Sequence, residues 1–115
     1  MNFIDEYVRD NNRRKVGYMC AFKMYGKVTI GYSAWNRRVD SPNWCLGKKI
    51  ALERAQKYAK LKEYPDIPFS VMKKLPDFIF RCGRYFKNAT FVDWVYCFLL
   101  DYADPDEYTE LPCPE

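Results

Sequence analysis

Apolar residues recur at helical spacing through one long stretch of the chain, residues 41–62. Ser41 suits the N-cap and Pro42 the first turn, and good helix formers follow them. Successive steps of about 100° collect the apolar side chains on one arc: Leu46, Ile50, Ala51, Leu52, Ala55, Tyr58, Ala59 and Leu61. We therefore predict an amphipathic helix over residues 41–62.

One charged residue falls inside this arc. Arg54 lies near Gly47 and Ile50 on the predicted helix, where an unpartnered guanidinium would lose several kcal/mol of hydration. Three interpretations are open: a structural partner such as Asp40 or a helix C-terminus, an anionic ligand, or exposure at the edge of the arc. Arg54 is therefore a candidate both for packing and for binding.

Two runs rich in β-branched and aromatic residues, 15–24 and 27–34, flank the dipeptide Tyr25-Gly26 and predict an antiparallel β-hairpin. The alternating positions that we expect to lie on the predicted helix are Val16, Tyr18, Cys20, Phe22, Val28, Ile30, Tyr32 and Ala34. The opposite face would hold small residues, namely Gly17, Ala21, Gly31 and Ser33. Close approach there predicts edge pairing between two copies, a homodimer. A one-residue slip in register would swap the two faces.

The segments on either side of these elements carry shorter signals. Residues 2–11 place apolar side chains at helical spacing after Asn2, which predicts a short N-terminal helix. Residues 63–69 contain two prolines and are expected to be extended. Ser70 is predicted to cap a short helix, and Pro76 then kinks that helix or begins a fresh one.

The C-terminal part of the chain contains two helical patterns and a tail. Residues 77–87 favour a helix, and Thr90 with Asp93 is similar to a capping box ahead of a strongly apolar helix. Residues 101–115 form an acidic tail in which we expect no regular structure. The pattern as a whole predicts a single α+β domain over residues 1–100, in which the antiparallel hairpin packs against the amphipathic helix with further short helices.

Composition narrows the class of protein. A chain of 115 residues with 49% apolar and 18% aromatic residues is long enough to fold around one core. The longest apolar run, Trp94 to Leu100, is far shorter than the roughly 20 residues that a membrane-spanning helix needs. The acidic N-terminal residues do not fit a signal peptide. We therefore expect a protein with no membrane partner that acts in the cytoplasm of a host cell.

The inventory of reactive side chains is poor. There is no histidine, and no Cys-x-x-Cys pair occurs among the five cysteines, Cys20, Cys45, Cys82, Cys97 and Cys113. The tripeptide Gly47-Lys48-Lys49 lacks the other residues of a phosphate-binding loop. We therefore expect no metal, no cofactor and no catalytic residue, and hence no enzyme.

Charge is distributed unevenly along the chain. All 19 Lys and Arg residues and nine of the 15 acids lie in residues 1–100, while residues 101–115 hold the other acids. A basic body of this kind would meet phosphate, an acidic protein surface or its own tail, although a solvated surface explains many such imbalances. A tail of acids and aromatics can imitate phosphate and base. Its candidate partner-binding residues are Tyr102, Asp104, Asp106, Glu107 and Tyr108.

The basic residues of the body provide a candidate nucleic-acid interface. They lie before the hairpin, after it and along the polar side of the predicted helix: Arg13, Arg14, Lys15, Arg37, Arg38, Lys48, Lys49 and Lys57. If these segments converge, Trp35 and Trp44 border a basic patch and can stack on bases. The two indoles can equally be packing residues of the fold.

One pattern joins the second strand of the hairpin to the predicted helix. It is a strand that ends in Gly-x-Ser, then an Asp, then Leu-Gly-x-x-Ile-Ala-x-x-Arg-Ala: Gly31, Ser33, Asp40, Leu46, Gly47, Ile50, Ala51, Arg54 and Ala55. The pattern covers about a quarter of the chain and resembles small bacteriophage-encoded accessory proteins, anti-CRISPR proteins among them.

This resemblance implies stoichiometric binding that inhibits a host defence protein or nucleoprotein. Two alternatives stay open: a nucleic-acid-binding module that uses the basic body, and a sponge that holds a signalling nucleotide near Arg54. Salt separates nucleic-acid binding from protein binding, since contacts to phosphate weaken as the salt concentration rises.

Overall fold

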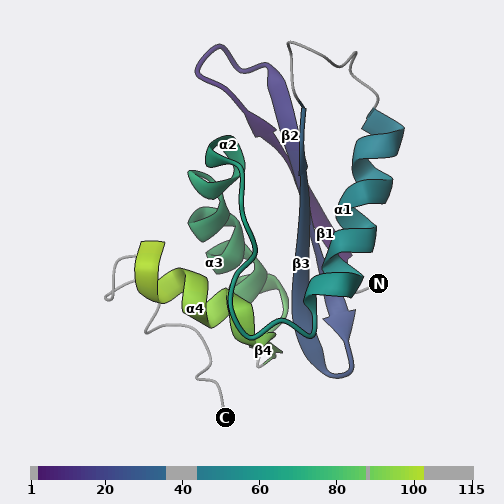
Figure 1. Ribbon diagram of the computed structural model, residues 1–115, viewed down its shortest axis with the longest axis vertical. Helices are drawn as coiled ribbons and strands as arrows, with labels where there is room; N and C mark the ends of the chain where they lie inside the picture. Colours follow the sequence, from purple (N-terminus) through teal and green to yellow (C-terminus); the bar gives the residue numbers. More distant parts are fainter. Residues whose placement is uncertain (1–2, 36–43, 88, 103–115) are drawn as a thin grey trace.

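The fold is α+β, as predicted, and its sheet has four strands. The computed structural model describes residues 3–35, 44–87 and 89–102. In chain order the elements are β1 (Phe3–Arg9), β2 (Lys15–Met24), β3 (Lys27–Ala34), α1 (Trp44–Tyr58), α2 (Phe69–Met72), α3 (Leu75–Tyr85), β4 (Thr90–Phe91) and α4 (Asp93–Tyr102). The strand order is β1-β2-β3-β4, with the first three strands antiparallel and β4 parallel to β3 (Figure 1).

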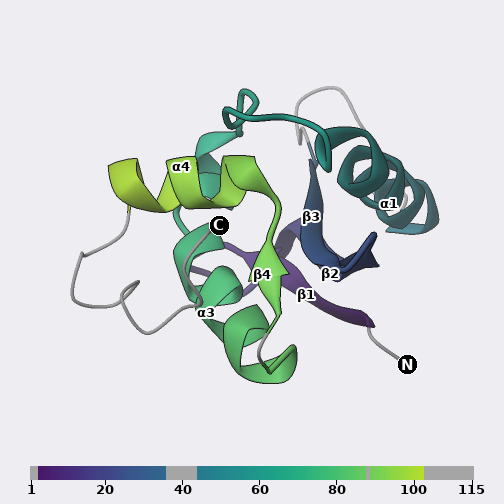
Figure 2. The same ribbon diagram turned by 90° about the horizontal axis from the view of Figure 1, so that it is seen from below.

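The sheet separates two helical layers of different thickness. Helix α1 lies on one face, against β2 and β3, and α2, α3 and α4 lie on the other (Figure 2). The side with three helices holds the main core, built around large side chains such as Trp94, Phe78 and Phe98. The α1 side holds a second, smaller cluster around Tyr18 and Cys20.

The predicted hairpin is confirmed, and its turn decides which residues share a face. Tyr25 and Gly26 both have positive φ, 54° and 78°, as a two-residue hairpin turn of the favoured hand requires. This turn pairs Met24 with Lys27, so even-numbered positions of β2 lie opposite odd-numbered positions of β3.

The predicted assignment of faces is therefore wrong for β3, and it is also wrong for Val16 of β2, which packs against the main core. Tyr18, Cys20 and Phe22 do lie on the α1 side, but their partners across the ladder are Ser33, Gly31 and Thr29. The side chains of Val28, Ile30 and Tyr32 point to the main core. The small residues thus do not share one open face, and a homodimer remains a prediction that needs another surface.

The N-terminal segment is a strand, and the predicted helix over residues 2–11 is wrong. β1 pairs antiparallel with β2 and covers the outer edge of the hairpin. Ile4 and Val8 are buried in the main core, while Phe3 and Tyr7 pack on the α1 side, so both faces of β1 carry apolar residues. Such a segment satisfies a helical pattern as well as a strand pattern, and pairing with β2 decides between them.

Helix α1 approaches the sheet through small residues. Ala51 and Ala55 are its buried residues, and they face Gly31 of β3. A Cβ atom added to Gly31 would lie 1.9 Å from the carbonyl oxygen of Ala51, so only glycine permits this approach. The predicted apolar arc is too wide, since two of its residues are exposed: Leu46 by 51% and Leu52 by 36%.

The C-terminal end of α1 is held by the sheet. The hydroxyl of Thr29, which is fully buried, donates to the carbonyl oxygen of Ala55 at 2.6 Å. Because α1 ends at Tyr58, this carbonyl is among the last four of the helix, which lack a partner within it. The start of the helix predicted at Ser41 lies outside the described residues, and the described helix ends four residues before Lys62.

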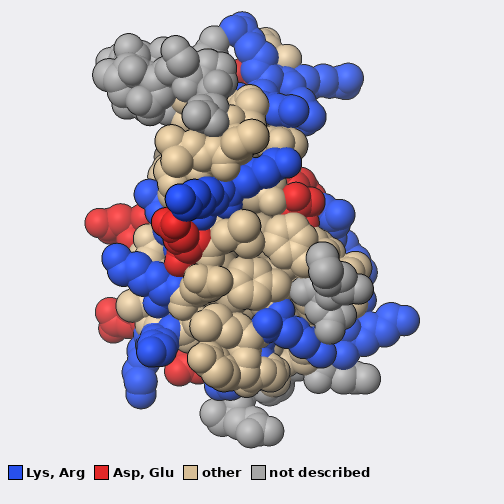
Figure 3. Space-filling model, turned by 90° about the vertical axis from the view of Figure 1, so that its right-hand side faces the viewer, with Lys and Arg blue, Asp and Glu red and all other residues tan. Residues whose placement is uncertain are grey.

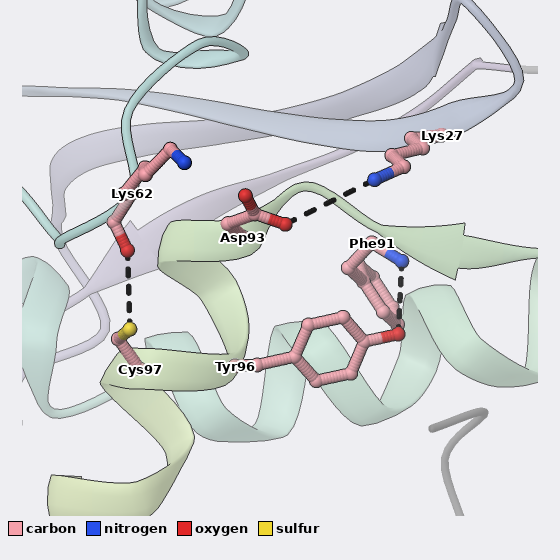
Figure 4. A network of polar contacts seen from close by, with 6 residues as sticks. All are labelled: Lys27, Lys62, Phe91, Asp93, Tyr96 and Cys97. Carbon is pink, nitrogen blue, oxygen red and sulfur yellow. Dashed lines mark hydrogen bonds and ion pairs between the residues drawn. The ribbon is translucent and has the colours of Figure 1, made fainter. Parts of the chain in front are cut away.

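The second half of the chain builds the layer that contains α2, α3 and α4, which we call the thick layer. Ser70 lies inside α2, after Pro68 at the N-cap, so its predicted capping role is wrong. Pro76 stands in the first turn of α3, which confirms a fresh helix start. Thr90 belongs to the short strand β4 instead of a helix cap. Beside β4, the backbone N–H of Phe91 donates to the hydroxyl of Tyr96 at 3.0 Å (Figure 4).

Candidate nucleic-acid interface

Aromatic rings and lysines from four parts of the chain meet beside the N-terminal end of α1. We call this set the aromatic–basic cluster, and its members are Tyr7, Lys15, Tyr18, Trp35, Trp44 and Lys48. The strands β1 and β2 supply one side, the end of β3 and the start of α1 supply the other. Figure 3 shows Lys and Arg side chains on the face that carries α1, with uncharged surface and a few Asp and Glu side chains among them.

The four rings of the cluster form a continuous edge-to-face series. The centroids of Trp35 and Trp44 are 6.3 Å apart, those of Trp44 and Tyr7 5.4 Å, and those of Tyr7 and Tyr18 5.5 Å. Edge-to-face contact orients each ring against the next. Trp35, Trp44 and Tyr7 remain half-exposed, whereas Tyr18 is buried. Three rings of the series are thus partly exposed to solvent.

Two lysines sit on these rings. The Nζ of Lys15 lies 4.1 Å from the ring centroid of Tyr7. The Nζ of Lys48 lies 5.6 Å from Tyr7 and 5.8 Å from Tyr18. An ammonium over an aromatic face is attracted by the ring's electrons. The arrangement therefore holds two positive charges near one partly exposed tyrosine ring.

Backbone structure fixes these side chains in place. A register shift between Val8 and Arg9 brings Lys15 opposite Arg9, one position out of the regular ladder. The backbone N–H of Trp35 donates to the carbonyl of Val16 at 2.9 Å, which continues the pairing beyond the end of β3. The cluster therefore stands on the sheet and on α1, which are more rigid than loops.

Tyr18 is the buried ring of the cluster, and a hydrogen bond fixes its position. Its hydroxyl donates to the carboxylate of Asp5 at 2.7 Å. Burial, and then this hydrogen bond, raise the pKa of Tyr18 well above its usual range. Tyr18 is therefore a neutral support for the lysines and not a ligand contact.

Arg54 has a structural role. Its Nη1 donates to the backbone carbonyl of Tyr32 at 3.1 Å, and its Cζ lies 5.6 Å from the Tyr32 ring centroid. β4 pairs with β3 only at Lys27 and Val28, so this carbonyl lies beyond the paired part of that edge. Of the three interpretations left open by the sequence, this contact fits a structural partner, and that partner is a strand carbonyl. Asp40 lies outside the described residues.

The other predicted basic residues differ in position. Arg13 and Arg14 are exposed in the turn between β1 and β2, where the Asp10 carboxylate accepts the backbone N–H of Arg14 at 2.9 Å. Lys49 and Lys57 are exposed on α1, apart from the ring contacts. The structure thus brings together Lys15, Trp35, Trp44 and Lys48 of the predicted set, while Arg37 and Arg38 lie outside the described residues.

Tyr102 departs from its predicted place in the tail. It is the last residue of α4, and its ring lies 4.9 Å from that of Phe98 and 5.7 Å from that of Tyr64. A small aromatic cluster therefore holds it, although it is 45% exposed. The other tail candidates, Asp104, Asp106, Glu107 and Tyr108, lie outside the described residues.

The residues that carry the resemblance lie mostly where α1 meets β3. Gly31 faces Ala51 and Ala55, and a Cβ atom on Gly47 would lie 3.2 Å from the hydroxyl of Ser33. The pattern thus coincides with close helix–sheet packing, and sequence reasoning missed Tyr7, the centre of the cluster. Recognising residues 3–9 as a strand beside β2 would have placed Tyr7 opposite Tyr18.

The described ranges contain neither a metal site nor a membrane-spanning helix. Residues 3–35, 44–87 and 89–102 contain no group of His, Cys, Asp and Glu side chains arranged to hold a metal ion. In that same part of the chain, no helix has both the length and the apolar character needed to cross a membrane.

Comparison with protein-family models, with curated protein sequences and with solved structures gives no match. The function is therefore argued from the residues of this chain.

Proposed function

We propose that this protein is a non-catalytic binding protein that holds single-stranded nucleic acid on the aromatic–basic cluster. The observation that carries the proposal is the contact of Lys15 and Lys48 with the half-exposed ring of Tyr7, next to Trp44 and Trp35. Proteins that bind single strands combine positive charge along the backbone with aromatic platforms for bases. The cluster supplies both.

Each part of the cluster has a role in this proposal. Lys15 and Lys48 contact phosphate, and Arg13 and Arg14 in the neighbouring turn extend the positive surface. Bases stack on the rings, at about 1–3 kcal/mol per base. Because bases in a duplex already stack on each other, half-exposed rings favour unpaired bases. No histidine or metal is needed for such binding.

The test is a titration of the full chain with a dT oligonucleotide, followed by tryptophan fluorescence. Trp94 is fully buried, so quenching reports Trp35 and Trp44. We expect quenching, and an affinity that falls as salt rises. Replacing both cluster lysines, Lys15→Glu with Lys48→Glu, should weaken binding by about tenfold or more. The control changes Lys74 and Lys87, which are exposed in the segments that flank α3, to Glu.

Equal losses in the two double variants would contradict the proposal, because they would indicate general attraction between a basic chain and an anion. Binding without quenching would place the nucleic acid away from Trp35 and Trp44. Preference for a duplex over the single strand would also contradict it.

Inhibition of a host protein, as the resemblance implies, is a second proposal. Leu46 and Leu52 are exposed on α1, and exposed apolar side chains favour contact with protein. Capture from host lysate after nuclease treatment and at high salt tests it. One partner that survives both treatments supports the antagonist, and loss of every partner supports the nucleic-acid proposal.

The proposed nucleotide sponge receives less support. It depends on Arg54 as an anion contact, and the guanidinium of Arg54 already donates a hydrogen bond to the carbonyl of Tyr32.

The proposed cytoplasmic location has one argument in its favour. Cys20, Cys45, Cys82 and Cys97 are free thiols, as expected in a reducing compartment.

A further inference from the structure

An open cavity lies beside α4, on the segment that follows α1. Its volume is about 540 Å³, which is within the range of ligand sites. It is lined by Glu63, Tyr64, Cys97, Leu100 and Asp101. None of these residues belongs to the aromatic–basic cluster, and the described residues that line the cavity include no Lys or Arg.

The apolar part of the cavity is supported by an aromatic cluster. The ring of Tyr64 packs edge-to-face on Phe98, with centroids 5.8 Å apart, and on Tyr102 at 5.7 Å. These contacts hold Tyr64 firmly against α4. Leu100 completes the apolar surface and is 66% exposed, close to the C-terminal end of α4, where Asp101 and Tyr102 are exposed as well.

The charged part of the cavity is negative. The hydroxyl of Tyr64 donates to Oδ2 of Asp101 at 2.6 Å, which leaves the other carboxylate oxygen available to a ligand. Glu63 is exposed at the same cavity. The Cys97 thiol donates to the backbone carbonyl of Lys62 at 3.1 Å, and Figure 4 shows the Lys62 side chain directed away from Cys97.

We propose that this cavity binds a lysine or arginine side chain from a basic segment of a protein partner. The stem of such a side chain would pack on Leu100 and the ring of Tyr64. Its cationic end would meet the carboxylates of Glu63 and Asp101, as a charge-assisted hydrogen bond requires. This site is independent of the proposed nucleic-acid interface.

Charge also selects among occupants. The chain has a net charge of +4, which opposes general attraction of a basic peptide, so binding must come from the local carboxylates. Residues 103–115 of the chain carry five acids and no Lys or Arg, so they have the wrong charge for this cavity. A second copy of the chain could offer its basic residues, and the test distinguishes that occupant.

The test uses the full chain and an N-acetylated, C-amidated tetra-arginine peptide. Backbone amide shifts in NMR spectra should locate the peptide at the cavity, and calorimetry should give its affinity. The double variant Glu63→Gln with Asp101→Asn should weaken binding by about tenfold or more, since it removes both charges and keeps the shapes. The matched control, Glu53→Gln with Asp77→Asn, removes two exposed acids elsewhere and should change affinity less than about twofold.

Three outcomes would overturn the proposal. They are equal losses in the two double variants, amide shifts confined to residues outside the cavity, and a dimer of the full chain that dissociates in the Glu63→Gln with Asp101→Asn variant. If that variant does not fold, Leu100→Lys decides the matter, because it places a cation at the exposed wall of the cavity. Undiminished peptide binding by Leu100→Lys would then overturn the proposal.

Discussion

The two faces of the sheet are packed by opposite means. On the side of α2, α3 and α4, large side chains fill the space, and Trp94, Phe78 and Phe91 are almost completely buried. On the α1 side, Ala51 and Ala55 lie directly on Gly31, with little side-chain volume between helix and strand. Large side chains therefore fill the layer of α2, α3 and α4, the thick layer. In the layer of α1, the thin layer, close packing requires the small residues Gly31, Ala51 and Ala55.

This difference has a consequence for function. Because α1 lies so close to the sheet, the rings at its N-terminal end are left half-exposed at the rim of the layer. The thick layer buries large rings such as Trp94 and Phe98, but Phe69 of α2 is 73% exposed and Tyr85 of α3 is 48% exposed. The thick layer has one such exposed ring beside a lysine, Phe69 with Lys73, whereas the thin layer carries a connected series of rings with two lysines.

Substitutions at two neighbouring residues of β3 should reveal the difference between the two layers most strongly. Ile30 faces the thick layer and is fully buried, so Ile30→Ala should destabilise the protein by about 3–4 kcal/mol. Gly31→Ala should destabilise it by about 3 kcal/mol or more, because the added Cβ meets backbone on α1. Urea unfolding measures both.

Gly26→Ala is the control for this pair, because it changes another glycine in the same hairpin. A Cβ atom there has no neighbour within 4 Å, but φ is +78°, so we expect a loss of about 1–2 kcal/mol. A smaller loss for Gly31→Ala than for Gly26→Ala would contradict close packing of α1 on β3.

Alkaline pH should destabilise both layers. Burial raises the pKa of Cys20 on the thin side to about 12, and that of Cys82 on the thick side well above its usual value. A raised pKa in the folded state gives stability that is complete below the ordinary thiol value near 9 and is lost as the pH rises through the folded value. Unfolding free energy should thus fall above about pH 9, by about 1.4 kcal/mol per pH unit per group.

The variant Cys20→Ala should reduce this pH slope, and Cys45→Ala, at an exposed thiol, should leave it unchanged. Urea unfolding at pH values between 7 and about 11 gives the slopes. An identical slope in both variants would mean that Cys20 does not carry the effect.

The hydrogen bond from Thr29 to α1 should have an intermediate effect. Thr29→Val removes a buried hydroxyl, so the carbonyl of Ala55 loses this hydrogen bond. We expect the free energy of unfolding to fall by about 1–2 kcal/mol. Thr29→Ser keeps the hydroxyl and should lose less. Comparable losses would assign the effect to packing of the methyl group instead.

The smallest effect on stability is expected at the aromatic–basic cluster. Lys48 is exposed, so Lys48→Glu should change the unfolding free energy by no more than about 0.5 kcal/mol. The same variant should weaken binding of a dT oligonucleotide. A large loss of stability would instead identify Lys48 as a structural residue of the thin layer.

Prediction from sequence succeeded where the signals are local. The hairpin with Tyr25-Gly26 at its turn, the α1 helix and the fresh helix start at Pro76 all depend on neighbours in the chain. On the sequence alone, a basic patch is conditional on convergence of the hairpin ends with the polar side of the helix. The structure brings together four residues of that set, Lys15, Trp35, Trp44 and Lys48. Tyr7 was missed because residues 3–9 carry apolar side chains on both faces, a pattern that does not distinguish strand from helix.

The sequence by itself determined the α+β class, the hairpin and a basic body rich in aromatic residues. Only the tertiary structure decided that β1 is a strand, that β4 joins β3 in parallel, and that Arg54 binds the Tyr32 carbonyl. The second and third of these features join residues far apart in the chain, and the first joins β1 to the next strand across a turn. Their energies come from pairing and burial across that distance, and no local pattern encodes them.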